Sequence, residues 1–504
     1  MTVPPYDRPN PGAFGPPAPG GPSGAPSWDG AEPPAGRRSR RAAVVAAVVG
    51  GVVVVGGAGY ATASYLSGGG TQPEQVLPGD VLGFVKVDLD PSAGQKMALR
   101  SLLEKFPDVD TEGDGDIRDQ LLQPLLELSG DELDYAADVE PWLGDRMAVA
   151  AVVADDSAAG VVPVVALAVT DEERMTDALT RAQEGADFGF AVREDFVLIT
   201  DTQERADGIA AAEQTLADDA DFGGDREALG GDQVALGWAD LSAAQGVVER
   251  QASAQGVPAD VLGGAQLAGR VILGVHAQDD GIEMVGMDFG VSDVGVPTGD
   301  PTRLAQDLPE DTLAALSASG AGDSAVAAWA ELEGSGALAE VEQPLAELGL
   351  SLPDDLRAVL GSDFVVAVSG DLESPALGAR VVTEKPEAAA RSLDAILGSL
   401  DLGAAPVYSF GESDYVVATD AGTADALAAD GGLGDTDAFR AAVADPDGAS
   451  AIGYVDLATV LDEVVARGGQ AGEEAAKFSA VEALGLSVSG TDDGSRFVLR
   501  ITTR

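Results

Sequence analysis

The pattern of apolar and polar residues divides the chain into regions. Residues 1–41 are rich in proline and glycine and hold few large apolar side chains, which predicts a disordered tail that ends in an arginine cluster. Residues 42–66 then form an apolar run of 25 residues without a charge. A helix of that length exceeds the roughly 30 Å hydrocarbon core of a bilayer. We therefore predict a transmembrane helix over 42–66 and a linker over 67–75.

The charges around the apolar run predict its orientation. Arg37, Arg38, Arg40 and Arg41 precede the run, and no basic residue follows it before Lys86. The positive-inside rule places the N-terminus in the cytoplasm and residues 67–504 outside, which predicts a single-pass protein of the cell membrane. Ala61-Thr62-Ala63 also fits a signal-peptide cleavage pattern, so cleavage after Ala63 is the alternative. The lengths of the run and of the preceding tail favour an uncleaved anchor.

The remainder of the chain contains an internal repeat. The segment LGWADL from Leu236 returns as IGYVDL from Ile452, and WLGDRMAVAA from Trp142 returns as VLGSDFVVAV from Val359. FVLITD from Phe196 likewise returns as YVVATD from Tyr415. Collinear matches of this kind indicate a duplication. We predict a first repeat over 76–295, a linker over 296–306 and a second repeat over 307–504.

Each repeat mixes strand and helix patterns. The runs MAVAAVV from Met147 and VVPVVALAV from Val161 are typical of strands, and DEERMTDALTRAQ from Asp171 is typical of a helix. Alternating apolar residues before Asp280-Gly281 predict a hairpin with a type I′ turn. The predicted fold class is α+β, with two tandem copies of a largely antiparallel sheet that carries helices packed on one face, preceded by a disordered tail and one transmembrane helix.

The segments LPGDVLGFVKVDL from Leu77 and DVEPWLGDRMAVA from Asp138 follow the tail and the apolar run. In this arrangement the chain resembles actinobacterial membrane-anchored proteins that carry domain of unknown function 3352. The resemblance covers roughly residues 70–504. It implies a location in the cell envelope and supplies neither an assigned activity nor catalytic residues.

Charge and cysteine content exclude several classes of function. The net charge is −56, and residues 1–66 carry five arginines against three acids, so the remainder carries −58. A surface of that sign repels phosphate backbones, which argues against nucleic-acid partners. The chain has no cysteine, which excludes disulfides, thiolate catalysis and attachment of a lipid to cysteine.

Residues typical of catalysis are scarce. The single histidine, His276, lies one position from Val275 in an alternating strand, and the matching residue of the second repeat is Ser489. A structural role for His276 is therefore the favoured interpretation. The chain contains no phosphate-binding loop, no dinucleotide-binding glycine motif on a strand and no serine elbow. We assign no catalytic residues and no cofactor.

One acidic run, DVDTEGDGDIRD from Asp108 to Asp119, resembles a calcium-binding loop. The second repeat keeps its glycines but replaces Asp114 by Ser335 and Asp116 by Ala337. A solvated acidic loop is therefore preferred over a calcium site. The calcium ligands under the alternative would come from Asp108, Asp110, Glu112, Asp114 and Asp119.

These observations predict a protein of the cell envelope that is not an enzyme and whose acidic, duplicated ectodomain binds a partner protein or an apolar, lipid-like ligand. Two similar units side by side create a cleft, which is a usual place for a ligand. One alternative is an exported hydrolase that uses carboxylates or a Ser/Lys pair. A structural spacer is the other alternative.

Overall fold

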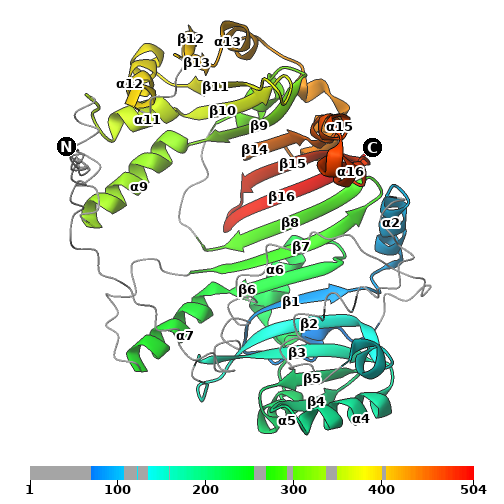
Figure 1. Ribbon diagram of the computed structural model, residues 1–504. Coiled ribbons are helices and arrows are strands. Elements are labelled where there is room, and N and C mark those ends of the chain that lie inside the picture. The colour runs from blue at the N-terminus through cyan, green and yellow to red at the C-terminus, as the bar shows by residue number, and fades with distance from the viewer. Residues whose placement is uncertain are drawn as a thin grey trace, which may run out of the picture.

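The computed structural model describes residues 70–106, 118, 122, 134–157, 159–254, 268–291, 299–335, 349–399 and 405–504 (Figure 1). The predicted tail and the apolar run 42–66 lie outside these residues. Within the described ranges, no helix is both long enough and apolar enough to cross a membrane.

The strands fall into two sets that follow one another along the chain. Those of the first half are β1 (Val81–Asp88), β2 (Leu143–Val153), β3 (Val161–Val169), β4 (Gly189–Arg193), β5 (Phe196–Thr200), β6 (Ala235–Asp240), β7 (Arg270–Gln278) and β8 (Gly281–Phe289). Those of the second half are β9 (Thr312–Ser319), β10 (Asp363–Ser369), β11 (Ala376–Val382), β12 (Val407–Phe410), β13 (Asp414–Ala418), β14 (Ala449–Asp456), β15 (Val481–Gly490) and β16 (Gly494–Thr503).

Helices separate the strands in both halves. The first half contains the short turns η2 (Pro73–Gln75), η3 (Tyr135–Val139) and η4 (Leu216–Asp218) and the helices α2 (Ala93–Leu103), α4 (Glu172–Gln183), α5 (Gln203–Ala210), α6 (Ala220–Leu229) and α7 (Leu241–Ala254). The second half contains α8 (Pro301–Gln306), α9 (Ala321–Ser335), α11 (Asp354–Leu360), α12 (Pro386–Ser399), α13 (Ala421–Ala428), η6 (Leu433–Asp435), α14 (Asp437–Ala442), α15 (Leu457–Arg467) and α16 (Gly469–Ala476).

All sixteen strands belong to one antiparallel sheet, in the order β12-β13-β11-β10-β9-β14-β15-β16-β8-β7-β6-β1-β2-β3-β5-β4. The order read outward from β16 repeats the order read outward from β8, strand for strand. The two halves meet where β8 pairs with β16, from Gly281 opposite Thr502 to Phe289 opposite Gly494. Figure 1 shows the resulting curved sheet, with the two halves at its two ends.

The predicted fold class is wrong, because the two repeats share one sheet and do not form two separate sheets. Each half ends in a hairpin, β7–β8 or β15–β16. If each half formed a sheet alone, the outer strand of its hairpin, β8 or β16, would be an open edge. An open edge presents unpaired backbone N–H and C=O groups. The two edges satisfy these groups by pairing with each other, so one sheet forms instead of two.

The prediction of helices on one face is also wrong, because helices pack on both faces of each half. In β2, Ala148 and Ala150 face a core that includes Phe222 of α6, whereas Met147 faces a core that includes Met175 of α4. In the second half, α8, α13 and α14 cover one face and α11 and α12 pack on the other. Strands buried on both faces have continuous apolar runs, and MAVAAVV is such a run.

The predicted hairpin is present, but its turn differs from the prediction. Gln278 pairs with Gly281, so Asp279 and Asp280 form the connection. Neither aspartate has a positive φ, and a type I′ turn needs positive φ at both central residues. The helix predicted from Asp171 is confirmed as α4, and the Asp171 side chain accepts a hydrogen bond from the Arg174 amide.

Candidate functional site

The predicted calcium ligands Asp108, Asp110, Glu112, Asp114 and Asp119 lie outside the described residues. Elsewhere, the described part of the chain holds no cluster of three acidic or histidine side chains that would suit a metal ion. His276 lies on β7, where its Nδ1 is 3.0 Å from the backbone oxygen of Asp232. This contact orients the ring near the end of the strand, where His276 pairs with Glu283 of β8.

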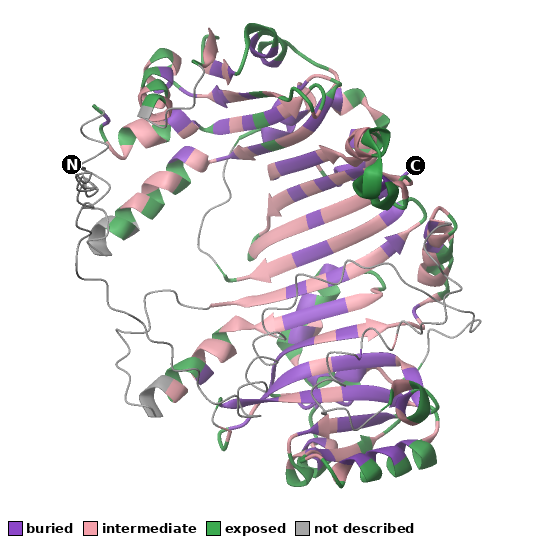
Figure 2. Cartoon of the chain, viewed as in Figure 1, coloured by how far each residue is buried: buried purple, intermediate pink, exposed green. Residues whose placement is uncertain are grey.

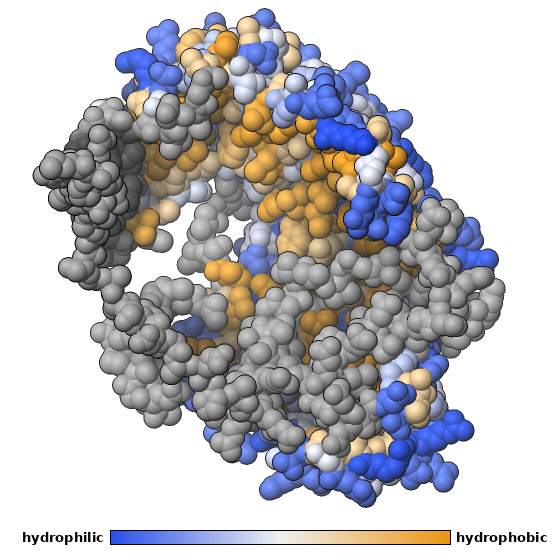
Figure 3. All heavy atoms as spheres, viewed as in Figure 1, coloured by the Kyte–Doolittle hydropathy of each residue, from blue (hydrophilic) through white to orange (hydrophobic). Residues whose placement is uncertain are grey.

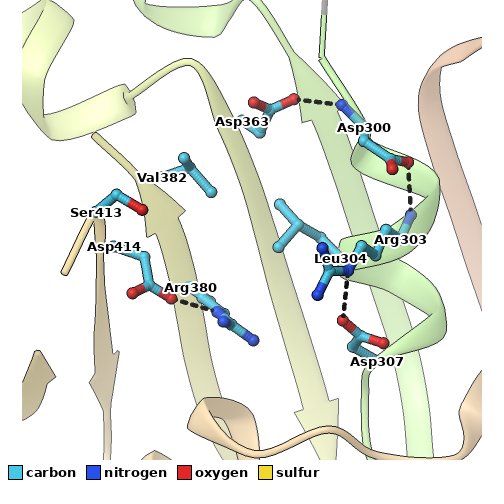
Figure 4. A pocket seen from close by; sticks show the side chains of 9 residues that line it. All are labelled: Asp300, Arg303, Leu304, Asp307, Asp363, Arg380, Val382, Ser413 and Asp414. Carbon is cyan, nitrogen blue, oxygen red and sulfur yellow. Dashed lines mark hydrogen bonds and ion pairs between the residues drawn. The ribbon is translucent and has the colours of Figure 1, made fainter. Parts of the chain in front are cut away.

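A pocket with a volume of about 390 Å³ lies between α8 and the strands β10, β11 and β13 (Figure 4). Its polar side chains are already engaged with one another. The Arg303 Nε is 3.4 Å from the Asp307 carboxylate, and the Arg380 Nε donates to Asp414 at 2.6 Å. The lining residues are Asp300, Arg303, Leu304, Asp307, Asp363, Arg380, Val382, Ser413 and Asp414.

Asp363 is the most buried charge in this pocket, and its carboxylate accepts three hydrogen bonds. The donors are the Asp300 amide at 3.0 Å, the Ser319 hydroxyl at 2.6 Å and the Ser362 hydroxyl at 3.0 Å. The matching residue of the first half is Arg146, which is paired with Asp88 at 3.4 Å. Opposite charges therefore occupy the same place in the two halves. In the second half, the Asp363 carboxylate joins the Asp300 amide, at the start of α8, to Ser319 of β9.

Four of the five lysines in the described residues contact an acidic or a threonine side chain. The ammonium groups of Lys86, Lys96 and Lys477 contact Glu74, Asp90 and Glu474 respectively. Lys105 donates to the Thr503 hydroxyl at 2.8 Å. The hydrolase alternative therefore gains no support from these four side chains.

One side of the sheet is apolar from β11 to β3, and we call it the apolar face. Residues that pair across neighbouring strands share a face of the sheet. One row of paired residues consists of Ala379, Val366, Leu316, Gly453, Leu486, Leu499, Met284, Val275, Ala235, Val87, Met147 and Leu167. The adjacent row consists of Val381, Phe364, Ala318, Ala451, Val488, Phe497, Gly286, Leu273, Gly237, Val85, Val149 and Val165.

The two ends of the apolar face are covered by helices. Met175 and Leu179 of α4 pack with Met147 and Leu167 in the first half. Ala389 and Ala390 of α12 pack on Val381 in the second half. Between these ends many side chains of the central strands are only partly buried, as the intermediate colour of β15, β16, β7 and β8 in Figure 2 shows.

Three large apolar side chains of this face are exposed in the second half. Leu316 of β9 is 49% exposed, Val366 of β10 is 44% exposed and Leu377 of β11 is 46% exposed. Leu316 and Val366 are directly paired, and Leu377 pairs with Val368 two positions further along β10. Figure 3 shows hydrophobic side chains gathered over the strands of this upper part of the sheet. A cluster of exposed apolar side chains on one surface commonly marks a binding site.

The first half contains a small apolar cavity on the same face. Its volume is about 110 Å³, and Val85, Val149, Leu122 and Leu167 are among its lining residues. Leu122 is 3% exposed and packs with Met147. An aliphatic side chain therefore already lies over the floor made by β1, β2 and β3.

Sequence reasoning missed the apolar face, although a signal for it was present. Leu484, Leu486 and Val488 alternate along β15, and this alternation is visible in the sequence. Ser487 points to the opposite side of the same strand and is buried. The apolar side of β15 therefore cannot be recognised as the more exposed one from the polarity of its residues. The two rows extend over twelve strands, and they become visible only when the register between neighbouring strands is known. The sequence of a single strand does not specify that register.

The family described as "Protein of unknown function (DUF3352)" matches residues 42–407. The chain belongs to this family. The match begins at the first residue of the apolar run and ends at the start of β12, so it covers most of the sheet. No curated protein matches the chain, and no solved structure matches it.

Proposed function

We propose that this member of the DUF3352 family is an actinobacterial cell-envelope protein, anchored to the bilayer through residues 42–66, whose extracytoplasmic part binds an apolar, lipid-like ligand on the apolar face. The observation that carries the proposal is the pair Leu316–Val366, two aliphatic side chains that are 49% and 44% exposed in a row of paired residues without a charged side chain.

The physical argument is the burial of apolar area. Covering exposed aliphatic surface contributes about 25 cal/mol per Å², or about 0.8 kcal/mol for each buried methylene. Neither row of the apolar face contains a charged or hydrogen-bonding side chain. An aliphatic ligand therefore fits this face better than a polar one does. The strong negative charge of the chain also disfavours recognition through an anionic headgroup.

The proposed location is supported by the sequence and by the family. Four arginines lie directly before the apolar run and no basic residue follows it before Lys86, and the family match includes that run from Ala42. Protease added to intact cells should digest residues 67–504 and leave the N-terminal tail protected. A shortened protein released into the medium, which has lost residues 1–63, would overturn the anchor.

Ligand binding can be tested on the full-length protein purified in a mild detergent. Organic extraction followed by mass spectrometry should recover a lipid with a long aliphatic chain from the wild type. The double variant Leu316→Gln with Val366→Thr should recover much less. Met97→Gln is the matched control, because Met97 on α2 is 67% exposed and belongs to neither row of the apolar face. Equal lipid content in all three proteins would contradict the proposed site.

A further inference from the structure

The pocket beside α8 lies on the face of the sheet opposite to the apolar face. Its volume is about 390 Å³. Asp363, Val382 and Asp414 pair across β10, β11 and β13, so their side chains share one face, and Val382 packs there with Leu304 of α8. The pocket is therefore separate from the surface on which we place the lipid-like ligand.

The first half fills the matching place with packed side chains. The strand pairings put Phe196 of β5 where Asp414 of β13 lies, one position away from the sequence match. Phe196 is 0% exposed, and its cross-strand partner Arg193 donates to the backbone oxygen of Ala212 at 2.9 Å. The residue that corresponds to Arg193 is Gly411, which has no side chain. The pocket is thus particular to the second half.

Two arginines supply hydrogen-bond donors to the pocket. The Arg380 Nε donates to Asp414 at 2.6 Å, and the Arg303 Nε lies 3.4 Å from Asp307. Within the described ranges, no residue accepts a hydrogen bond from Nη1 or Nη2 of either arginine. Figure 4 shows the two guanidinium groups pointing toward each other across the pocket. Guanidinium groups bind carboxylates in a bidentate manner, so a carboxylate suits the space between them.

Two aspartates give the pocket a site for a positive charge. Asp300 and Asp363 are adjacent, because the Asp300 amide donates to the Asp363 carboxylate at 3.0 Å. In the described part of the chain, no basic side chain forms an ion pair with either carboxylate. The lining holds four aspartates and two arginines, a balance of −2. Because Asp307 and Asp414 offset the two arginines, this excess belongs to Asp300 and Asp363.

We propose that the pocket binds a small zwitterion of the amino-acid type, with its carboxylate between Arg303 and Arg380 and its ammonium group beside Asp300 and Asp363. Overall charge favours a zwitterion over a simple ion. The strongly negative chain repels a free anion, and the two arginines repel a free cation. The inference goes beyond the proposed binding of a lipid-like ligand and does not rest on it.

The rest of the lining indicates the kind of side chain that the ligand carries. Leu304 and Val382 add aliphatic surface to the pocket. Its volume of about 390 Å³ lies near the lower end of the range for small-molecule sites, which is roughly 300 to 1,000 Å³. A free amino acid with an aliphatic side chain, such as leucine, fits both features.

The test is isothermal titration calorimetry on the full-length protein in a mild detergent, with L-leucine as the probe. Two analogues separate the charges: 4-methylpentanoate lacks the ammonium group, and 3-methylbutylamine lacks the carboxylate. Leucine should give saturable heat. Each analogue should bind at least about tenfold more weakly, because hydrogen bonds between charged groups are the strong ones. No saturable heat with leucine, or equal affinity for leucine and either analogue, would overturn the inference.

Variants locate the binding site. Arg303 is 72% exposed, so Arg303→Gln should fold as the wild type does, and it should weaken leucine binding at least about tenfold. Asp300→Asn should weaken leucine binding and leave that of 4-methylpentanoate unchanged, since asparagine caps a helix as well as aspartate does. Arg174→Gln is the matched control, because Arg174 on α4 is 66% exposed and also pairs with a nearby aspartate. Equal leucine affinity in the wild type, Arg303→Gln and Asp300→Asn would overturn the assignment of this pocket.

Discussion

Glu74 and Lys86 form a buried ion pair that ties the N-terminal entry of the fold to its first strand. The Lys86 ammonium lies 2.8 Å from Oε1 and 2.9 Å from Oε2 of Glu74. Glu74 is 1% exposed and Lys86 is 8% exposed. Arg226 of α6 approaches the same carboxylate at 3.2 Å. The segment directly after the predicted anchor is therefore held inside the fold from Pro73 onward.

Breaking this pair should destabilise the protein strongly. Glu74→Gln leaves the Lys86 ammonium buried without its counter-charge, which costs about 3 to 5 kcal/mol when a buried pair is broken. Urea unfolding of the purified protein should show the loss. The double variant Glu74→Leu with Lys86→Met should cost less than the two single variants summed, because neither charge is then left alone.

An exposed ion pair provides the control for that experiment. Arg100 and Glu104 on α2 are 3.2 Å apart, and their side chains are 75% and 68% exposed. Glu104→Gln should change the free energy of unfolding by less than about 0.5 kcal/mol, because exposed pairs on a helix contribute little. Equal effects of Glu74→Gln and Glu104→Gln would contradict the importance of burial.

Several local elements were predicted correctly from the sequence. The assembly of the strands into one sheet was not. The helix from Asp171 and the hairpin from Val271 follow from local periodicity and capping, which depend on neighbours in the chain. The pairing of β8 with β16 joins residues more than 200 positions apart, such as Gly286 and Phe497. No periodicity within either strand specifies that partner, so two sheets and one sheet give the same local pattern.

The candidate site was less predictable than the fold. His276, the single histidine, and the acidic run from Asp108 are recognisable in the sequence by residue type alone. The exposure of Leu316 is conspicuous only in three dimensions. A leucine in an alternating strand usually faces a core, whereas Leu316 is 49% exposed.

A buried three-residue cluster links α6 to the sheet and allows a graded prediction. Asp225 is 2% exposed and accepts hydrogen bonds from the Trp238 indole at 2.8 Å and from Arg270 at 2.8 and 3.0 Å. The hydrogen bond with Asp225 raises the pKa of Arg270 above its ordinary value. Asp225→Asn should therefore cost about 3 kcal/mol, because it removes the counter-charge of a partly buried arginine.

Trp238→Phe should cost less than Asp225→Asn. The phenylalanine removes one neutral donor but leaves Asp225 bound to Arg270, and a single hydrogen bond contributes about 1 kcal/mol. Denaturant unfolding followed by circular dichroism gives both values without depending on the fluorescence of Trp238. The reverse order of the two variants would show that the indole, not the ion pair, holds α6 in place.

The hydrogen bonds of Asp420, which caps α13, predict that the free energy of unfolding depends on pH. Its carboxylate accepts hydrogen bonds from the Thr423 hydroxyl at 2.6 Å and from the Thr423 amide at 3.0 Å, and these bonds lower the pKa of Asp420 below its ordinary value. A folded-state pKa below the unfolded value contributes stability above the unfolded pKa and loses it as the pH falls through the folded pKa. Thr423→Val should raise the pKa of Asp420 and reduce the loss of stability on acidification below about pH 4. Carboxyl NMR titration measures the pKa directly, and an unchanged value would rule out the hydroxyl as the cause.

Two glycines flank the pairing of β8 with β16 and should be intolerant of substitution. A Cβ on Gly281 would lie 2.0 Å from the backbone oxygen of Ile501, and a Cβ on Gly494 would lie 2.0 Å from the backbone oxygen of Asp288. Because backbone atoms cannot move aside as a flexible side chain does, Gly281→Ala and Gly494→Ala should force the two strands apart. Each should lower the free energy of unfolding by about 1 to 3 kcal/mol, as overpacking does.

Substitution of Gly208 in α5 by alanine should stabilise the protein, in contrast to the same substitution at Gly281 or Gly494. A Cβ there meets nothing within 4 Å, so Gly208→Ala should raise the free energy of unfolding by about 0.5 to 1 kcal/mol through helix propensity. Hydrogen exchange should show faster exchange of the β8 and β16 amides in Gly281→Ala and unchanged exchange there in Gly208→Ala. If all three alanine variants were equally stable, the close backbone approach between β8 and β16 could not be what joins the two halves into one sheet.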